Sequence, residues 1–564
     1  MKLPNFIFLI TLLTTIILQA QEASLDWVKT MGGTLGDKGQ SVTVDVFGNI
    51  YTTGSFSGTA DFDPGDAVFN LTTSGGFDVF VQKLAPNGDF LWAKSLGGTN
   101  TDIGQSIITD AAGNVYVTGY FRNSADFDPG AATFSLTSNG ASDIFIQKLD
   151  AEGDFIWAKS IGNTGNDSAF TLAIDNMANI YMIGYYRGTV DFDPNVPVFN
   201  LTSNGQSDVF ILKLDNDGEF LWAKSLGGTE ADIAFGITTD IMGSVYVTGG
   251  YKGTVDFDPG TAVFDLTSVG NSDVFVLKTT ADGDFLWAKS MGGIAAERGR
   301  SITTDTLGNV YLTGEFEETV DFDPNSTIVN LTSNGDRDVF IQCLSTNGIL
   351  KWVKSMGGIG KELGYAITND ELGNIYVAGE FEETIDFDPG VGIFNIVSNG
   401  SNDIYIQNLN LNGDFVWATS IGSAGPGDTA QSMTTDAEGN IYITGGFRFF
   451  TDFDPGSGTV NVIPQGGDDV FVLKLVHGAV GTNEQSLFND VSIFPNPSDG
   501  QMTIDLVGLK KVSIKIFSLN GQLVYFKENI TSQKHTFFLD AVSGFYFMEL
   551  STEEGRAWFK LIRE

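Results

Sequence analysis

Paired aspartates recur along the chain in one short motif whose residue types are suited to holding a cation. The motif reads DFDP followed by Gly or Asn, and its second Asp returns every 65 residues, with one step of 66. Asp-x-Asp places two carboxylates on one side of a turning segment, and Ca²⁺ takes several oxygen ligands. The sequence thus suggests calcium as a cofactor, although the motif is shorter than a full Asp-x-Asp-x-Asp-Gly loop. The candidate ligands are Asp61, Asp63, Asp126, Asp128, Asp191, Asp193, Asp256, Asp258, Asp321, Asp323, Asp386, Asp388, Asp452 and Asp454.

The same motif is also typical of a structural turn. Pro fixes the first corner of a type I or II turn, and Gly or Asn at the next position permits a positive backbone angle. In this interpretation Asp63 and its equivalents accept backbone hydrogen bonds, and Phe62 and its equivalents pack inward. We favour the turn over calcium, and the two interpretations are compatible.

A further acid in every repeat follows the tryptophan segment. If the strands run from centre to rim, this connection and the DFDP segment emerge on the same face. The sequence then predicts three carboxylates per repeat on one face. The additional acids are Asp37, Asp102, Asp167, Asp232, Glu297, Glu362 and Asp428.

Residues that break the repeat are candidates for a unique ligand site. Both histidines, His477 and His535, follow the repeats, which excludes histidine-based triads and imidazole zinc sites within them. A carboxylate pair like that of a glycosidase stays open, but acids repeated in every unit favour a non-catalytic role. Cys343 stands where other repeats carry Lys, and we interpret it as an ordinary strand residue. The better candidates are the irregular arginines Arg122, Arg187, Arg298, Arg300, Arg337 and Arg448.

The segments between these residues are β in character. Within one unit, "FLWAKSLGG", "GQSIITD", "NVYVTGYF" and "DIFIQKL" alternate and are separated by Gly, Asn and Asp. Four strands in each of seven repeats predict an all-β chain with a seven-bladed β-propeller. Because the first repeat starts at the Trp27 strand and the last ends at Val470 to Leu475, pairing these two strands would close the ring. The tryptophans are expected to pack between blades.

The repeats resemble the SBBP family of β-propeller repeats. The resemblance rests on "GQSIITDAAGNVYVTGYF" and copies such as "GRSITTDTLGNVYLTGEF", and it covers about Trp27 to Leu475. The DFDP insertion lengthens the unit beyond the usual blade, so the resemblance does not explain it.

The chain after residue 489 resembles the type IX secretion sorting domain of the Bacteroidetes. The matching features are "IFSLNGQLV", "GFYFMEL" and the sorting motif Pro495, Asn496, Pro497 and Gly500. Its alternating strands predict a small β-sandwich. The resemblance implies the type IX machinery as a partner, passage through the outer membrane, and release from or attachment to the cell surface of a Gram-negative bacterium.

The start of the chain and its composition complete the predicted organisation. The apolar run after Lys2 and the small residues near Ala20 indicate a signal peptide. We expect a signal peptide at 1–20, repeats at 21–476, a linker at 477–489 and a sorting domain at 490–564. No later segment is long enough to span a membrane. The formal charge of −40 argues against nucleic acid as a partner.

These features predict a secreted or surface-attached propeller that acts as a binding, adhesion or scaffold module. Its ligand would be an extracellular glycan or protein. Two alternatives remain, a carboxylate-dependent polysaccharide-active enzyme and a purely structural surface protein, because fold does not select among them.

Overall fold

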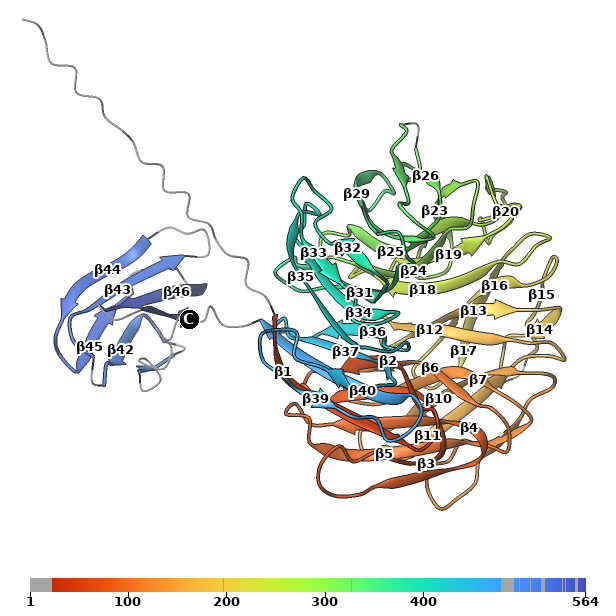
Figure 1. Cartoon of the computed structure of the whole chain (residues 1–564), viewed down its shortest axis with the longest axis horizontal. Helices are drawn as coiled ribbons and strands as arrows, with labels where there is room; N and C mark the ends of the chain where they lie inside the picture. Colours follow the sequence, from red (N-terminus) through yellow and green to blue (C-terminus); the bar gives the residue numbers. More distant parts are fainter. Residues whose placement is uncertain are drawn as a thin grey trace, which may run out of the picture. The chain divides into compact units, whose positions relative to one another are not determined.

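The computed structural model describes residues 23–195, 197–325, 327–477, 491–496, 498–507, 509–518, 523–539, 541–542, 544–552 and 556–563. The chain divides into two compact units between residues 477 and 478 (Figure 1). The predicted signal peptide, residues 478–489 of the predicted linker, and Pro497 lie outside the described residues.

The first unit repeats one antiparallel arrangement of four strands, paired in the order first, second, third and fourth. The first strands are β2 (Lys38–Val44), β6 (Ile103–Thr109), β12 (Ser168–Ile174), β18 (Ile233–Thr239), β24 (Arg298–Thr304), β30 (Leu363–Asn369) and β36 (Thr429–Thr435). The second strands are β3 (Ile50–Asp61), β7 (Val115–Phe121), β13 (Ile180–Tyr186), β19 (Val245–Tyr251), β25 (Val310–Phe316), β31 (Ile375–Phe381) and β37 (Ile441–Phe447).

The third and fourth strands complete each arrangement. The third strands are β4 (Asn70–Leu84), β10 (Asp143–Leu149), β16 (Asp208–Leu214), β22 (Asp273–Thr279), β28 (Asp338–Leu344), β34 (Asp403–Leu409) and β40 (Asp469–His477). The fourth strands are β5 (Phe90–Gly98), β11 (Phe155–Ile161), β17 (Phe220–Leu226), β23 (Phe285–Gly293), β29 (Leu350–Met356), β35 (Phe415–Ser423) and, beside β40, β1 (Ala23–Gly33).

The pairing of β1 with β40 joins the two ends of the repeat array. Trp27 lies opposite Lys474 and Met31 opposite Val470, in the pairing that the sequence predicts. Each first strand also contacts the first strand of the next repeat, and β36 contacts β2 (Figure 1). A buried cluster that includes Val42, Ile50, Tyr442 and Val470 packs the first repeat against the last.

The DFDP segments form short hairpins outside the four-stranded arrangements. In the first repeat the hairpin continues β3 and β4, where Asp61 lies opposite Asn70. The separate strands are β8 (Ser124–Asp126), β9 (Ser135–Thr137), β14 (Thr189–Asp191), β15 (Asn200–Thr202), β20 (Thr254–Asp256), β21 (Asp265–Thr267), β26 (Thr319–Asp321), β27 (Asn330–Thr332), β32 (Thr384–Asp386), β33 (Asn395–Val397), β38 (Thr451–Asp452) and β39 (Asn461–Val462).

The core of the first unit lies between the sheets of neighbouring repeats. One buried cluster, for example, combines Tyr51 and Val79 with Val115 and Phe145 of the following repeat. The tryptophans belong to these interfaces, as predicted: the Trp92 ring lies 6.2 Å from the Tyr51 ring, and its indole N–H donates to the carbonyl of Ala151. Both faces of each sheet are therefore covered, which explains the runs of adjacent apolar residues in the second and third strands.

The hairpin between the first and second strands owes its shape to an aspartate. Asp45 Oδ1 accepts hydrogen bonds from the backbone N–H groups of Phe47 and Asn49, and its Oδ2 accepts from the Tyr51 hydroxyl. Gly48 adopts a φ of 80°, a conformation that strongly favours glycine. The "DxxGNxY" pattern is thus a self-contained turn.

The second unit has two antiparallel sheets that share one buried cluster. The first contains β41 (Ser492–Phe494), β42 (Gln501–Asp505) and β45 (Lys534–Phe538). The second contains β44 (Leu523–Ile530), β43 (Val512–Ser518), β46 (Gly544–Ser551) and β47 (Arg556–Arg563). The Asn496 side chain accepts a hydrogen bond of 2.7 Å from the backbone N–H of Ile562, which ties the sorting motif to β47.

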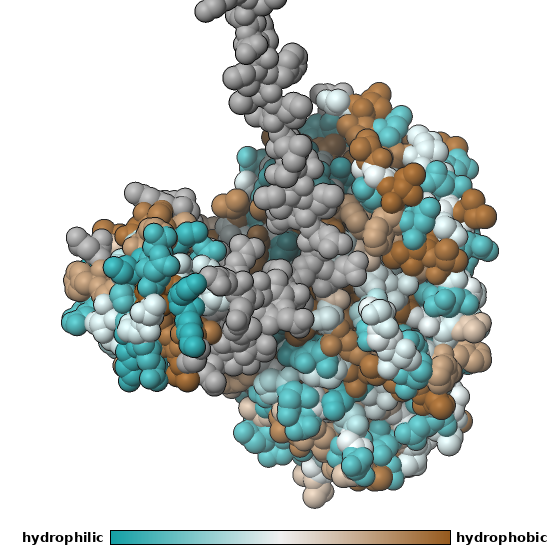
Figure 2. Space-filling model, turned by 60° about the vertical axis from the view of Figure 1, so that its left-hand side comes forward, coloured by the Kyte–Doolittle hydropathy of each residue, from teal (hydrophilic) through white to brown (hydrophobic). Residues whose placement is uncertain are grey.

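The surface mixes hydrophilic and apolar patches on the face that Figure 2 shows. Within the described part of the chain, no helix is long and apolar enough to cross a membrane.

Candidate functional site

The DFDP aspartates mainly accept hydrogen bonds from backbone N–H groups of their own hairpin. Asp61 Oδ1 accepts hydrogen bonds from the N–H groups of Asp63 and Phe69, and Asp63 Oδ1 accepts from Gly65. The same bonds recur in the other six copies. Phe62 and its equivalents are buried, as the turn interpretation predicts.

One detail of the predicted turn is wrong. Gly65 has no positive φ, so the residue after Pro does not supply the expected backbone angle. The reason is that the Asp63 carboxylate, through its bond to the Gly65 N–H, closes the turn instead. Positive φ angles occur earlier, at Gly58 and at its equivalents, which include Asn123, Gly188, Gly253, Glu318 and Glu383.

The third acid of each repeat does not join the DFDP carboxylates on an exposed face. Asp37 is fully buried, and its two oxygens accept hydrogen bonds from the N–H groups of Gly33 and Ser57. Its equivalents are buried in the same way because each ties the start of one repeat to the end of the preceding fourth strand. Within the described ranges, no three His, Cys, Asp or Glu side chains are grouped so as to hold a metal ion.

Each buried acid instead faces a second buried carboxylate on the third strand. The residue that carries it is the first of that strand in six repeats and lies within β4 in the first repeat. We call these the seam pairs because they lie between consecutive repeats. In each, the charge of one carboxylate raises the pKa of the other. The seam pairs are Asp78 with Asp102, Asp143 with Asp167, Asp208 with Asp232, Asp273 with Glu297, Asp338 with Glu362, Asp403 with Asp428, and Asp469 with Asp37.

Burial is the main cause of the raised pKa values in the seam pairs. It raises the pKa to about 8 for Glu297 and Glu362 and to about 7 for Asp78. A glycine at the end of each fourth strand makes room for the third-strand carboxylate: a Cβ at Gly97 would lie 2.6 Å from Asp78 Cγ. The raised pKa values make protonation easier at these seams, and protonation of a carboxyl removes the cost of burying its charge.

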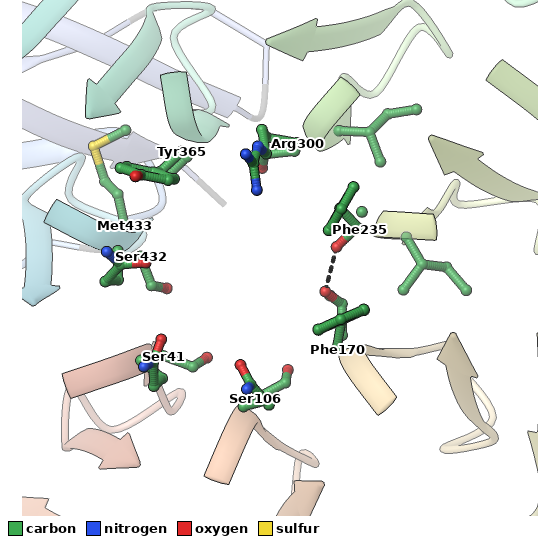
Figure 3. Close-up of a pocket in the computed structure, with 17 residues that line it drawn as sticks. Ser41, Ser106, Phe170, Phe235, Arg300, Tyr365, Ser432 and Met433 are labelled. Atoms are coloured by element: carbon green, nitrogen blue, oxygen red, sulfur yellow. Dashed lines mark hydrogen bonds between the residues drawn. The ribbon is translucent and has the colours of Figure 1, made fainter. Parts of the chain in front are cut away.

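A central cavity of about 290 Å³ is the best candidate for a ligand site. All seven first strands contribute side chains to its wall (Figure 3). At one register position the repeats differ, and the residues there are Gln40, Gln105, Phe170, Phe235, Arg300, Tyr365 and Gln431. One side of the wall is therefore aromatic and cationic, and the other carries amides.

On the aromatic side of the wall, neighbouring rings are in tilted contact. The Phe170 ring lies 5.8 Å from Tyr185 and 5.4 Å from Phe235. The Arg300 guanidinium carbon lies 4.9 Å from the Phe235 ring and 5.8 Å from the Tyr365 ring, in cation–π contact. These contacts fix planar side chains before any ligand arrives, which reduces the entropy lost on binding.

Arg300 is held by a buried carboxylate behind the wall. Its Nε and one terminal nitrogen donate to Glu315 at 2.7 to 3.1 Å, in a forked pair. Beside it, the Tyr365 hydroxyl donates to Glu380 at 3.4 Å, and burial raises the pKa of Glu380. Neither glutamate is among the described residues that line the cavity, and nor is any aspartate.

Serine hydroxyls link neighbouring repeats around the cavity. Ser41 Oγ accepts from the N–H of Ile107, and Ser432 Oγ accepts from the N–H of Val42. The second bond connects the last repeat to the first. Thr171 Oγ1 donates to the carbonyl of Phe235, the bond drawn in Figure 3.

The structure separates the arginines that the sequence singles out. Arg298 and Arg300 share Glu315, whereas Arg337 pairs with Glu317 and Arg448 with Asp468. Arg122 lies over the Tyr120 ring at 5.9 Å, and Arg187 borders a second, shallow cavity of about 650 Å³. Cys343 is buried, and burial raises the pKa of its thiol to about 12, so it is not poised as a nucleophile.

Sequence reasoning missed two groups of residues. The cavity aromatics Phe170, Phe235 and Tyr365 could have been found as departures from the repeated "GQS", read as "AFT", "AFG" and "GYA". The third-strand aspartates, such as Asp143, could have been found because every repeat carries an acid directly before a short apolar run such as "IFI".

Comparison with known proteins identifies both parts of the chain. The model of the secretion system C-terminal sorting domain matches residues 492–564. The β-propeller repeat model matches residues 91–120 and 416–445. The chain carries SBBP-type β-propeller repeats and a type IX secretion sorting domain. The sorting domain indicates a secreted or cell-surface protein of the Bacteroidetes, and β-propeller repeats imply a binding or scaffold module.

Two curated proteins are similar to parts of the chain. An uncharacterized WD repeat-containing protein, L264, of Acanthamoeba polyphaga mimivirus is 23% identical over 475 residues, covering 68% of this chain and 33% of that protein. Regulatory protein FlaEY of Caulobacter vibrioides is 27% identical over 200 residues, covering 36% of this chain and 20% of that protein. The chain thus spans a third or less of the length of these relatives.

Proposed function

We propose that the repeats form a closed seven-bladed β-propeller that binds an extracellular ligand, without catalysis, at its central cavity. The observation that carries the proposal is the asymmetric cavity wall, in which Phe170, Phe235, Arg300 and Tyr365 replace a residue that is Gln elsewhere. Repeats that are otherwise so alike have no packing reason to differ there. A concave site with aromatic walls and a few fixed polar groups is typical of ligand binding.

Ring closure is supported by three contacts between the first and last repeats. These are the β1 and β40 pairing, the contact of β2 with β36, and the hydrogen bond from Val42 to Ser432. Closure removes the exposed edge strands that an open array of repeats would have to protect.

Export follows from the proposed organisation of the chain. In this proposal residues 1–20 are a signal peptide, 21–476 the propeller, 477–489 a linker and 490–564 the sorting domain handled by the type IX machinery. The mature propeller then serves adhesion, capture or scaffolding outside the cell.

The alternative of a polysaccharide-active enzyme has less support. Glu315 and Glu380 contact Arg300 and Tyr365 of the wall, yet Glu315 is committed to Arg300 and Glu380 to Asn402 and Lys361. A glycosidase needs two carboxyl groups facing the substrate.

The experiment removes the two phenylalanines from the asymmetric wall and leaves Arg300 and Tyr365 in place. Phe235→Gln and the double variant F170Q/F235Q introduce glutamine, which three other repeats already have at this position as Gln40, Gln105 and Gln431. We would compare binding of labelled wild type and variants to arrayed glycans and to extracellular proteins, together with thermal unfolding. We expect lost binding at an unchanged unfolding midpoint; unchanged binding would refute the cavity as the site. Release of reducing sugar ends from a bound polysaccharide would refute the non-catalytic role.

A further inference from the structure

Ion pairing divides the six irregular arginines into two classes. Four of them, Arg298, Arg300, Arg337 and Arg448, have a carboxylate within 4 Å. Arg122 and Arg187 have no ion pair within the described ranges, although the chain has 70 acids and only 30 Lys and Arg residues. Burial raises the pKa values of Asp102 and Asp167, and the charges of the two arginines act to lower them, but no carboxylate among the described residues is paired with either guanidinium group, which leaves its N–H donors available to an external anion.

These two arginines occupy the same position in consecutive repeats, directly after β7 and β13. Both are exposed. The backbone at Arg187 is fixed, because the Asn163 side chain donates to its carbonyl and its own N–H donates to the buried Asp167 at 2.9 Å. Arg122 is held in the same way by Asp102.

A tyrosine two residues earlier accompanies each arginine, and the second of them, Tyr185, contacts the cavity wall. Burial raises the pKa of Tyr185, and the charges of both Arg187 and Arg122 oppose that rise, so both guanidinium groups lie within electrostatic reach of one ring. Tyr185 in turn contacts Phe170 of the cavity. We call the two arginines with Tyr120 and Tyr185 the arginine rim. It adjoins the cavity wall through the contact of Tyr185 with Phe170, and none of its four residues is among those that line the cavity itself.

We propose that the arginine rim binds the carboxylate or sulfate groups of an acidic polysaccharide. The inference rests on the proposed binding function and names the class of ligand. Guanidinium groups bind carboxylate and sulfate oxygens through paired N–H donors, and the tyrosines supply hydroxyls and apolar ring surface to the sugar. Two arginines one repeat apart match charges that recur along a polymer. The net charge of −40 repels polyanions at a distance, so a local cationic rim is required for capture.

The test uses the full-length secreted protein and three probes of equal length, an oligogalacturonate, a sulfated galactan oligomer and a neutral galactan oligomer. Affinities are measured by calorimetry at two salt concentrations. We expect at least one of the acidic oligomers to bind at least tenfold more tightly than the neutral oligomer. This preference should become smaller as the salt concentration rises. Arg122→Gln and Arg187→Gln should each weaken acidic binding about tenfold, as for loss of a charge-assisted hydrogen bond.

Arg448→Gln is the matched control, because Arg448 occupies the same repeat position but pairs with Asp468 at 3.0 Å. It should leave binding unchanged. Which acidic oligomer responds identifies carboxylate or sulfate as the natural group. Equal binding of all three probes, no binding of either acidic probe, or an equal loss in R448Q would overturn the arginine rim. The proposed function would survive each of these results, since it depends on the F170Q/F235Q comparison. Tight binding of a single-stranded DNA control of equal charge would also overturn the assignment to a polysaccharide.

Discussion

Substituting Glu297 by Gln should stabilise the repeats in a way that grows with pH. Glu297 is fully buried, its Oε2 accepts from the Gly293 N–H at 3.1 Å, and its Oε1 has no partner among the described residues. Burial, followed by the nearby charge of Asp273, raises its pKa from the ordinary 4.5 to about 8. The folded protein therefore binds a proton that the unfolded chain has already released.

The sign and size of the effect follow from this difference. Because the pKa is higher in the folded state, the stability linked to Glu297 is complete below pH 4.5 and is lost as the pH rises toward 8. Each pKa unit corresponds to about 1.4 kcal/mol. Between pH 5 and pH 8 the free energy of unfolding should thus fall by up to about 3 kcal/mol on account of this one group. Gln cannot ionise, and its NH₂ group can donate toward the Asp273 carboxylate.

The assay is urea unfolding of wild type and Glu297→Gln at pH 5, 6, 7 and 8 and constant ionic strength. The gain in unfolding free energy of the variant should be larger at pH 8 than at pH 5 by about 1–3 kcal/mol. Glu371→Gln, in an exposed hairpin turn, is the control and should show no such trend. A difference that is the same at every pH, or one that favours wild type at pH 8, would refute the account of the seam pairs.

Three further predictions concern the repeated turns and seams. Gly97→Ala should lower the free energy of unfolding by about 1–3 kcal/mol, because the added Cβ would overlap the Asp78 carboxylate. Gly36→Ala is the control and should not lower it, because a Cβ there would have no atom within 4 Å. Equal effects of the two substitutions in urea unfolding would contradict this prediction. Asp256→Ala removes the acceptor of two backbone N–H groups and should cost about 1–2 kcal/mol in thermal unfolding, and a neutral result would mean that the turn does not depend on it. Chelation of calcium at constant ionic strength should leave the unfolding midpoint unchanged, and a drop that calcium restores but sodium does not would make the DFDP carboxylates cation ligands after all.

The architecture could be predicted because repetition averages out local ambiguity. A single segment such as "NVYVTGYF" is a weak indication of a strand, but the same alternation at a constant period leaves few other folds. The partner of β1 could be predicted for a similar reason: a strand before the first repeat and a gap after the last are complementary. The residue types of the DFDP motif correctly predict a turn. They do not predict the backbone angle of Gly65, because a side-chain acceptor and a positive φ are alternative ways to close the same turn.

The repeated acids differ in burial, which the residue pattern does not reveal. Asp37 and Asp61 have the same residue type and the same period, yet one is buried between repeats and the other is partly exposed in a hairpin. Composition cannot separate them, because burial depends on which carboxylate the neighbouring sheet covers. The acids that repeat in all seven units therefore stabilise the fold.

In a repeat protein, the positions whose residues differ between repeats are the best candidates for a functional site. A residue needed for packing is needed in every repeat, so substitutions confined to one or two repeats are free of that requirement. Phe170, Phe235, Arg300 and Tyr365 depart from Gln at one position, and all four meet at the same cavity. Arg122 and Arg187 stand at a second position that varies between repeats, and they adjoin the cavity wall through Tyr185. Two variable positions that lie next to one cavity are stronger support for a ligand site than either alone. The seven closely similar turns supply the frame on which these residues are held.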